Sequence, residues 1–426
     1  MARYLLRALA PALLAAACDG APATVSDGGL DASLDAQAGA LAPPLYPTDR
    51  TLSPLTPDLV ERLRALHASA TGQDAVFAKI GDSHTVSAGY LTCFAGAAAD
   101  LGGRDLGATV AHFAAGDAAG TTPYQRTSLA ATVGWAAFQA LAGAPTPIEQ
   151  EVSTIEPAFA TVMFGTNDIG YDRIDRYGRD LATIADGLLA QGVIPVLSTI
   201  PPRDDSPAAD AQVPRYNAVA RGVAQTRGVP LVDLHRELAA LPGHGLGGDG
   251  LHLESFSGGA CKLTAAGLEH GNNVRNLHVL TTLDRLRRTV LAGEPAPDAD
   301  APRLAGTGSS TDPFVIAALP FADRRDTRTF GADLSASYPA CGPQDQRGNE
   351  IYYRVDVTAP TTLHAYALDA AADIDLVLLA GAPAADACVA RADTILDRQV
   401  EPGTYYVVAD TYAGLAGDYT IVVMED

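Results

Sequence analysis

Short apolar runs alternate with helical segments over residues 75–291, and this alternation constrains the fold of the chain more than any other feature. The runs are nearly uninterrupted, as expected for strands that are covered on both faces. Apolar residues at helical spacing fill the intervening segments, and Gly192 and Gly228 follow two of them as helix stops. Such alternation predicts a three-layer α/β domain with a parallel sheet. The predicted strands are 75–80, 161–164, 193–197 and 229–234, and the predicted helices are 174–188, 213–223 and 263–291, the last broken near Gly271.

The last part of the chain has a different period. Residues 351–357 alternate between apolar and polar, and 363–368 and 419–423 are further short strand candidates. Pro402-Gly403 marks a turn before the strand candidate 405–408. Short strands separated by Gly, Pro and Asp predict a C-terminal antiparallel β-sandwich.

Two segments without helical or strand periodicity divide the chain. Residues 18–48 are rich in Ala, Asp and Gly and predict a flexible tether, and a Pro- and Ala-rich linker covers 291–306. The expected domains are therefore the α/β domain at 49–290 and the sandwich at 307–426.

The N-terminus has the pattern of an export signal. Arg3 and Arg7 precede an apolar run at 8–17, which is too short to span a bilayer. The run ends in small residues directly before Cys18, and this resembles the lipobox of bacterial lipoproteins. That resemblance implies a signal peptide at 1–17, a lipidated Cys18 and a membrane anchor in the bacterial cell envelope. The alternative is an ordinary signal peptide cut near Ala17.

Composition limits the partners and the compartment. The formal net charge of -21 argues against binding to nucleic acid or to anionic lipid head groups. Besides Cys18 the chain has an even number of cysteines, as in proteins of oxidising compartments. Of three possible pairings, pairing within each domain favours Cys93–Cys261 and Cys341–Cys388. Four free buried thiols are the alternative.

Polar residues follow the predicted strands of the α/β domain. Ser83 comes after the first strand, Asn167 after the second, and Asp249 and His252 lie in a Gly-rich loop after the last. Sites in open α/β sheets form outside the carboxyl ends of strands, so these side chains are expected at one rim.

These residue types suit acyl transfer. Ser83 is a nucleophile once His252 takes its proton, and His252 can return that proton to the leaving alcohol. Asp249 can orient the imidazole, and the Asn167 amide can donate to the developing oxyanion. Asp82 and Asp168 are interpreted as residues that hold turns. The chain has no zinc signature or phosphate-binding loop, so we expect no metal and no cofactor.

Three motifs occur in family order and resemble blocks I, III and V of the SGNH (GDSL) hydrolases: Gly81-Asp82-Ser83, Gly165-Thr166-Asn167-Asp168 and Asp249-Gly250-Leu251-His252. The resemblance covers about residues 50–290. It implies a flavodoxin-like sheet and a Ser-His-Asp esterase mechanism, with Ser83, a glycine and Asn167 forming the oxyanion hole. His84 and Thr85 follow the serine where many members have Leu-Ser; His84 is interpreted equally as a cleft residue or as a structural one.

The glycine of block II has no distinctive motif. Gly134 fits best, because it lies one short segment before block III, and Gly116 and Gly120 are the alternatives.

Residues 307–426 resemble the bacterial pre-peptidase C-terminal (PPC) domain. The matching segments are 350–357, 373–378, 401–408 and 417–420. The resemblance implies an accessory module. Asp373 and Asp375 are interpreted as strand and turn residues.

The combined expectation is an exported, lipid-anchored serine esterase that hydrolyses O-acyl carbohydrate or lipid esters. One alternative is an O-acyltransferase with the same triad. Another is a non-enzymatic surface lipoprotein with a relict site.

Overall fold

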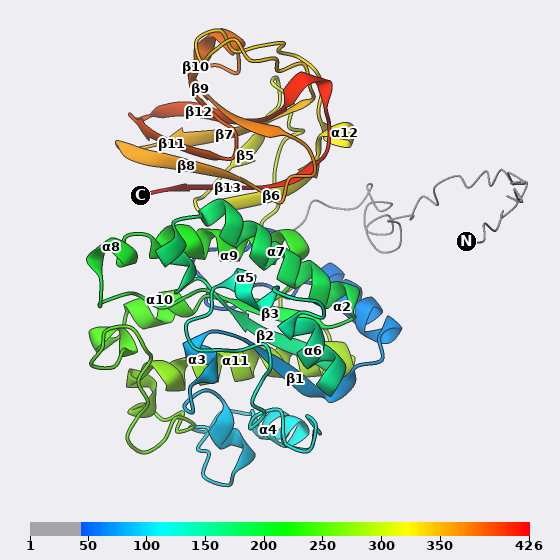
Figure 1. Cartoon of the computed structure of the whole chain (residues 1–426), viewed down its shortest axis with the longest axis vertical. Coiled ribbons are helices and arrows are strands. Elements are labelled where there is room, and N and C mark those ends of the chain that lie inside the picture. Colours follow the sequence, from blue (N-terminus) through cyan, green and yellow to red (C-terminus); the bar gives the residue numbers. More distant parts are fainter. Residues whose placement is uncertain (1–43) are drawn as a thin grey trace, which may run out of the picture. The chain divides into compact units, whose positions relative to one another are not determined.

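A parallel sheet of four strands, in the order β1-β2-β3-β4, forms the centre of the α/β part (Figure 1). This computed structural model describes residues 44–426, so the expected signal peptide, Cys18 and tether residues 19–43 lie outside the described residues. Each predicted strand overlaps an observed one. The strands are β1 (Gln73–Gly81), β2 (Pro157–Met163), β3 (Ile194–Ser198) and β4 (Leu231–Val232).

The free edge of β1 is occupied by a short extended segment. Ala131 forms a parallel bridge with Gly81, and the Gly81 N–H donates to the Ala130 carbonyl at 3.1 Å. The fifth strand position of a flavodoxin-like sheet is therefore reduced to a single bridge beside the end of β1. This bridge holds the segment that leads to Gly134 next to the Ser83 turn.

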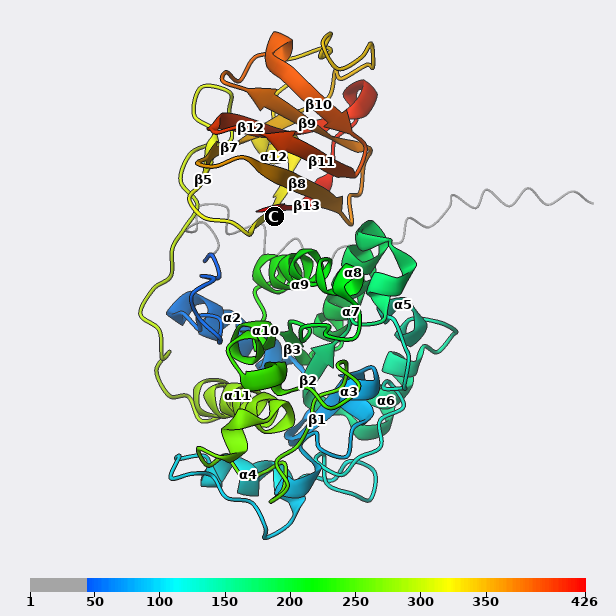
Figure 2. The same cartoon turned by 90° about the vertical axis from the view of Figure 1, so that its left-hand side faces the viewer.

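Helices cover both faces of the sheet, which gives the predicted three layers (Figure 2). On one face α7 (Ile174–Ala190) and α9 (Val213–Arg227) pack against each other and against β3. On the other, α4 (Gly107–Ala114) packs against β1 and α11 (Gly271–Leu286) packs against β4 and α4. The remaining α-helices of the α/β part are α2 (Pro57–Ser69), α3 (Ser83–Val86), α5 (Ala137–Ala140), α6 (Pro147–Ile155), α8 (Pro207–Asp210) and α10 (Leu234–Ala239).

The final helix expected at 263–291 is wrong over residues 263–270, and the break expected near Gly271 falls at the start of the observed helix. The α-helix begins at Gly271, after a 3₁₀ turn at Gly267–Glu269, and ends in a π-helical turn at Arg287–Leu291. Close backbone approaches accompany the late start. A Cβ on Gly267 would lie 1.7 Å from the Lys262 carbonyl oxygen, and one on Gly271 would lie 2.4 Å from that of Gly245.

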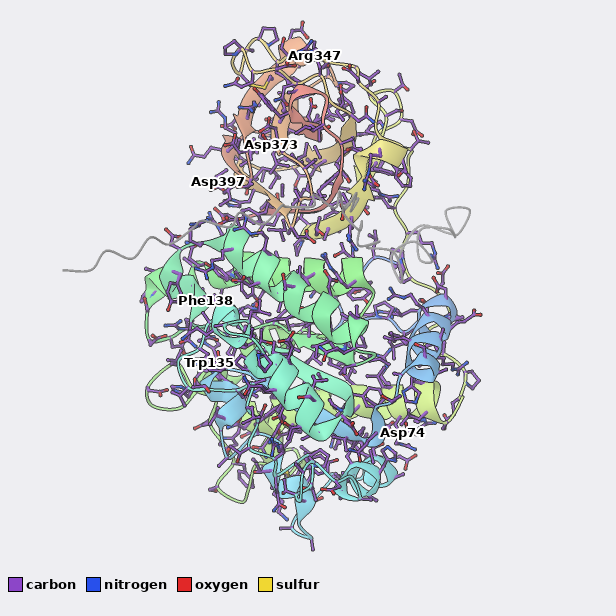
Figure 3. All side chains as sticks on the ribbon, turned by 45° about the vertical axis from the view of Figure 1, so that its right-hand side comes forward. Asp74, Trp135, Phe138, Arg347, Asp373 and Asp397 are labelled. Atoms are coloured by element: carbon purple, nitrogen blue, oxygen red, sulfur yellow. A yellow bond between two sulfur atoms is a disulfide. The ribbon has the colours of Figure 1, made fainter. Side chains whose placement is uncertain are left out.

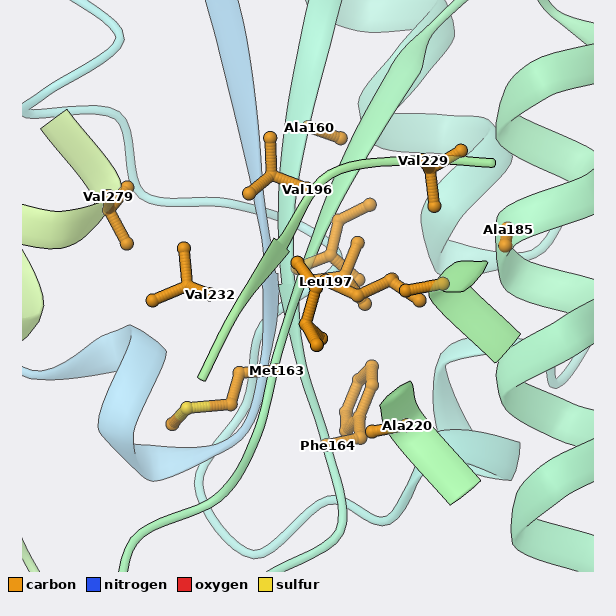
Figure 4. Packing of buried hydrophobic residues seen from close by; sticks show 14 of the residues in the cluster. Ala160, Met163, Phe164, Ala185, Val196, Leu197, Ala220, Val229, Val232 and Val279 are labelled. Atoms are coloured by element: carbon orange, nitrogen blue, oxygen red, sulfur yellow. The ribbon is translucent and has the colours of Figure 1, made fainter. Parts of the chain in front are cut away.

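Burial on both faces explains the uninterrupted apolar runs. Every residue of β2 and β3 is buried. Figure 4 shows Val196 and Leu197 of β3 among side chains from neighbouring strands and helices, including Met163, Val232 and Ala185. Strands covered on one face only would alternate instead.

Two sheets form the C-terminal β-sandwich that the sequence predicts. Their strand orders are β10-β9-β12-β7-β5 and β11-β8-β13-β6, and all pairs are antiparallel except β5 with β7. A short helix, α12 (Thr327–Phe330), follows β6. The strands are β5 (Phe314–Ile316), β6 (Phe321–Asp326), β7 (Glu350–Val357), β8 (Thr361–Leu368), β9 (Ile374–Ala380), β10 (Cys388–Ala392), β11 (Ile395–Val400), β12 (Gly403–Thr411) and β13 (Asp418–Glu425).

The sandwich packs on α7 and α9 through glycines. A Cβ on Gly178 would lie 2.6 Å from Leu368, and one on Gly222 would lie 2.7 Å from Val422. The glycines thus let strands β8 and β13 approach the two helices closely. A buried arginine of α9, Arg227, adds ion pairs with residues of both parts, namely Asp186 and Asp369.

Both favoured disulfides, Cys93–Cys261 and Cys341–Cys388, are present in the structure. Disulfides persist in oxidising surroundings, so the pair indicates an extracytoplasmic compartment. Within residues 44–426, none of the helices combines the length and the apolarity that crossing a bilayer requires.

Three carboxyl groups meet inside the sandwich. Asp410 of β12 lies directly opposite Glu350 of β7 on one side and Asp375 of β9 on the other, and all three are buried. Burial raises the pKa of Asp410 to about 9 and that of Glu350 to about 7. Asp375 also accepts hydrogen bonds from Gln346 and Arg391, at 2.5 Å each. Asp410 therefore keeps its proton at neutral pH and has no like-charge repulsion of its own.

These raised pKa values predict a pH-dependent stability. Between the unfolded value near 4 and about 9, the native Asp410 binds a proton that the unfolded chain has released, so stability falls as the pH rises through this window. We expect Asp410→Asn, whose amide is neutral at every pH and can donate to the neighbouring carboxyls, to flatten this dependence. Thermal unfolding at pH 5, 7 and 9 measures it.

Asp356→Asn is the matched control on β7. The pKa of Asp356 is held below its usual range by a hydrogen bond from Thr404. The stability of this variant should therefore fall with rising pH as that of the wild type does. An equal change of melting temperature with pH in Asp410→Asn and in the wild type would contradict the prediction.

Candidate active site

Ser83 begins a one-turn helix directly after β1. Asp82 caps this helix α3 by accepting from the His84 backbone N–H at 3.0 Å. Gly81 must lack a side chain here, because a Cβ would lie 2.3 Å from Thr85 Oγ1 and 2.6 Å from the Met163 carbonyl oxygen. The tight turn leaves the Ser83 side chain half-buried at the carboxyl end of the sheet.

His252 and Asp249 lie in a loop that closes on itself. Leu246 bridges Leu253, and the Gly247 N–H donates to the His252 carbonyl at 2.7 Å. His252 Nε2 is 3.0 Å from Ser83 Oγ, and His252 Nδ1 is 2.7 Å from Asp249 Oδ2. The structure therefore brings the three predicted residues into one hydrogen-bonded series, Asp249–His252–Ser83.

The Asp249 carboxylate is stabilised in its charged form. The hydrogen bond from the His252 ring, followed by the backbone N–H groups of His252 and Leu251, holds the pKa of Asp249 well below its usual range. The His252 and Asp249 side chains are 45% and 54% exposed. Asp249 is therefore ionised, and both side chains are accessible to water.

Asn167 lies just beyond β2, in a loop held by its neighbour. Asp168 accepts from the Gly165 and Ala137 N–H groups at 3.0 Å each, which confirms that it holds the turn. Burial is the main cause that raises the pKa of Asp168 to about 7. Asn167 Nδ2 donates to the Trp135 carbonyl at 2.9 Å and lies 3.5 Å from Asp82 Oδ2. Figure 3 labels Trp135 and also Phe138, which belongs to α5.

The three candidate glycines of block II lie in different surroundings. Gly116 packs against Ala75, because a Cβ there would lie 2.0 Å from the Ala75 carbonyl oxygen, at the opposite end of β1 from Ser83. The Gly120 N–H already donates to Asp117 at 2.6 Å. Gly134 lies between Trp135, which contacts Asn167, and Val133, which lines the cavity beside Ser83. Gly134 is thus the candidate whose two neighbours contact the site, and its role in the oxyanion hole stays a prediction.

An open cavity of about 300 Å³ lies over the serine. Sequence reasoning missed most of its wall, which comes from several separate segments. Ser83, His84 and His252 were named from the sequence. Val86, Ser87, Val133 and Leu253 could have been foreseen, because each lies within a few residues of a named site residue, whereas Asn272 carries no local signal. The lining residues are Ser83, His84, Val86, Ser87, Val133, His252, Leu253 and Asn272. Within residues 44–426, no three His, Cys, Asp or Glu side chains form a group that could hold a metal ion.

Comparisons with known proteins give one family match. Residues 80–255 match the GDSL-like Lipase/Acylhydrolase family, and the matched segment includes Ser83, Asn167, Asp249 and His252. No curated protein matches the chain.

Several solved structures are similar to parts of the chain. A GDSL-like lipase from Bacteroides thetaiotaomicron is 14% identical over 53% of this chain and 97% of its own, with a TM-score of 0.31. A catalytic mutant of an acetylxylan esterase from Geobacillus stearothermophilus is 15% identical over 50% and 95%, with a TM-score of 0.33. The pre-peptidase C-terminal domain of a collagenase from Bacillus anthracis is 15% identical over 26% and 91%, with a TM-score of 0.19.

Substitution of Gly81 tests the geometry of the serine turn. Gly81→Ala forces a Cβ against the Met163 carbonyl, so the turn must shift and move Ser83 away from His252. We expect labelling of Ser83 by a fluorophosphonate to slow about 10²-fold, since a displacement of about 1 Å can cost that much. The stability loss should be about 1–3 kcal/mol.

Gly107→Ala is the matched control, because its added Cβ would meet no atom within 4 Å. Its labelling rate and melting temperature should equal those of the wild type. Unchanged labelling in Gly81→Ala would show that the turn tolerates a side chain.

Proposed function

We propose that this chain, whose residues 80–255 form a GDSL-like lipase/acylhydrolase domain, hydrolyses carboxylic esters through an acyl intermediate on Ser83. The observation that carries the proposal is the hydrogen-bonded series from Asp249 through His252 to Ser83, with contacts of 2.7 and 3.0 Å. A nucleophile, a base and a group that orients the base are the parts that this chemistry needs.

The reaction proceeds in two halves. Ser83 Oγ attacks the ester carbonyl carbon while His252 Nε2 takes the hydroxyl proton, and a tetrahedral oxyanion forms. Its collapse breaks the bond to the alcohol, which leaves with the proton from His252. Water then attacks the acyl-Ser83 carbonyl while His252 Nε2 takes a proton from it. The bond between the acyl carbon and Ser83 Oγ breaks, His252 gives the proton to Ser83 Oγ, and the carboxylic acid is released. Asp249 stabilises the imidazolium in both halves.

Three N–H donors stabilise the oxyanion in this proposal. They are the backbone N–H groups of Ser83 and Gly134 and the side-chain amide of Asn167. The Asn167 amide has two hydrogens: one donates to the Trp135 carbonyl at 2.9 Å, and the other faces Asp82 Oδ2 at 3.5 Å. In this proposal the second hydrogen turns from that long contact to the oxyanion as its charge develops.

The cavity supports a short acyl group. Its volume of about 300 Å³ is at the lower end for ligand pockets. Val86 and Val133 are exposed beside it, at 45% and 66%, and offer a shallow apolar edge rather than a deep channel. Short O-acyl esters of carbohydrates fit this shape better than long-chain lipid esters.

The enzyme is exported and anchored by lipid on Cys18 in this proposal. Export is supported by the two disulfides, which need an oxidising compartment. The anchor is supported by the small residues directly before Cys18 and the polar segment after it.

Loss of the nucleophile is the direct test. Ser83→Ala should reduce hydrolysis of p-nitrophenyl acetate to background and abolish fluorophosphonate labelling. Asn167→Ala should lower kcat by about 10²–10³-fold with a smaller change in KM, because one oxyanion donor is lost. Ser153→Ala, on the exposed face of α6, is the control that should keep full activity.

The same assays separate the alternatives. Full activity in Ser83→Ala would refute the serine mechanism. A folded wild-type protein that neither labels nor hydrolyses a panel of acetylated glycans would support a non-enzymatic surface lipoprotein. Acylated sugar in place of free acid would identify an O-acyltransferase with the same triad.

The anchor has its own test. When the full chain is expressed in a bacterium with labelled palmitate, the wild type should carry the label and sediment with membranes. Cys18→Ala should lose both, whereas Ser26→Ala, in the same segment, should keep them. Release of unlabelled wild-type protein would support an ordinary signal peptide instead.

A further inference from the structure

His84, the residue after Ser83, lies buried beneath the site with two partners. Only 2% of it is exposed. Its Nε2 is 3.1 Å from the carbonyl oxygen of Leu251, and its Nδ1 is 3.2 Å from Asp82 Oδ1. Leu251 immediately precedes His252. The His84 ring therefore joins the turn that bears Ser83 to the loop that bears His252.

The partners decide how the His84 ring donates. A carbonyl oxygen can only accept, so Nε2 carries a hydrogen and donates to Leu251. On the other side of the ring, Nδ1 faces Asp82 Oδ1. The Arg275 guanidinium donates to the His84 carbonyl at 2.7 Å, and the His252 ring lies 5.4 Å away between centroids. The ring is thus fixed from both sides.

Asp82 extends the same connection to the third loop. It is fully buried, and its Oδ2 lies 3.5 Å from Asn167 Nδ2. The two neighbours of Ser83 in the sequence therefore contact the two other loops of the site. Asp82 contacts the loop of Asn167, and His84 contacts the loop of His252.

The His252 loop has few such ties to the serine turn. Its own hydrogen bonds shape it internally, and its Gly250 carbonyl accepts from the Asp205 N–H at 3.0 Å. The His252 and Asp249 side chains are about half exposed, so packing alone holds them weakly. The hydrogen bond from His84 to Leu251, the residue before His252, therefore helps to set the distance between His252 Nε2 and Ser83 Oγ.

We propose that His84 is a positioning residue, which holds His252 opposite Ser83 through its hydrogen bond to the Leu251 carbonyl. This inference rests on the proposed function of the Ser83 site. His84 does not touch the reacting atoms in this role; it fixes the length of the contact through which the proton moves. Small displacements of such contacts reduce rates steeply.

Two near-isosteric variants separate the two bonds of His84. In His84→Gln the amide nitrogen can occupy the place of Nε2 and still donate to Leu251. In His84→Asn it can occupy the place of Nδ1 and donate only to Asp82. Kinetics of p-nitrophenyl acetate hydrolysis by the full chain should show kcat about 10–100-fold lower in His84→Asn, with KM changed less than about 3-fold. His84→Gln should keep kcat within about 3-fold of the wild type.

His112→Asn is the matched control. His112 Nε2 also contacts a backbone carbonyl, that of Asp74 at 3.0 Å, but near the start of β1 and away from the site. The His112→Asn variant should have the kcat and KM of the wild type. Melting temperatures of all variants are measured alongside, because a structural role alone would lower them without separating kcat from KM.

Each outcome decides the inference. Wild-type kcat in His84→Asn, or equal losses of kcat in both His84 variants, would overturn it. Should His84→Asn fail to fold, His84→Gln decides: retained kcat supports the role of the Leu251 bond, and lost kcat overturns it. Activity that survives Ser83→Ala would instead refute the proposed function itself.

Discussion

The carboxylate of Asp82 is the interaction on which the site depends. A buried carboxylate is costly unless donors surround it, so the turn after β1 must supply them. It does so with the backbone N–H and the ring of His84, and the Asn167 amide lies at 3.5 Å. When the Asp82 carboxyl has these hydrogen-bond donors, Ser83 lies between them at the carboxyl end of the sheet.

In each loop of the site an aspartate accepts backbone N–H groups and so holds the loop in place. Asp168 accepts backbone N–H groups from its own turn and from the start of α5, and Asp249 accepts those of Leu251 and His252. Carboxylates suit this role because two oxygens can accept several N–H donors at once. The loops are therefore held by side chains within the motifs themselves.

The sequence predicted the fold class, which the structure confirms, because strands covered on both faces must be uninterrupted and apolar. It also named Ser83, Asn167, Asp249 and His252, since polar residues after parallel strands share one rim; their catalytic roles stay predictions. It failed over residues 263–270, where helical periodicity continued but the preceding backbone pairs with Asp100 through the Asp100–Lys262 bridge and the Leu263 N–H. Contacts between distant segments leave no trace in local periodicity.

What the sequence by itself determined is therefore local: the order of strands and helices, the two-part architecture and the residues that follow each strand. Tertiary structure decided what depends on distance between segments. It placed Gly116 against Ala75 near the start of β1 and Ala131, three residues before Gly134, beside Gly81 at the end of β1; the role of Gly134 stays a prediction. It also gave His84 its partner, because a side chain finds the Leu251 carbonyl only after β1 and β4 lie in the same sheet.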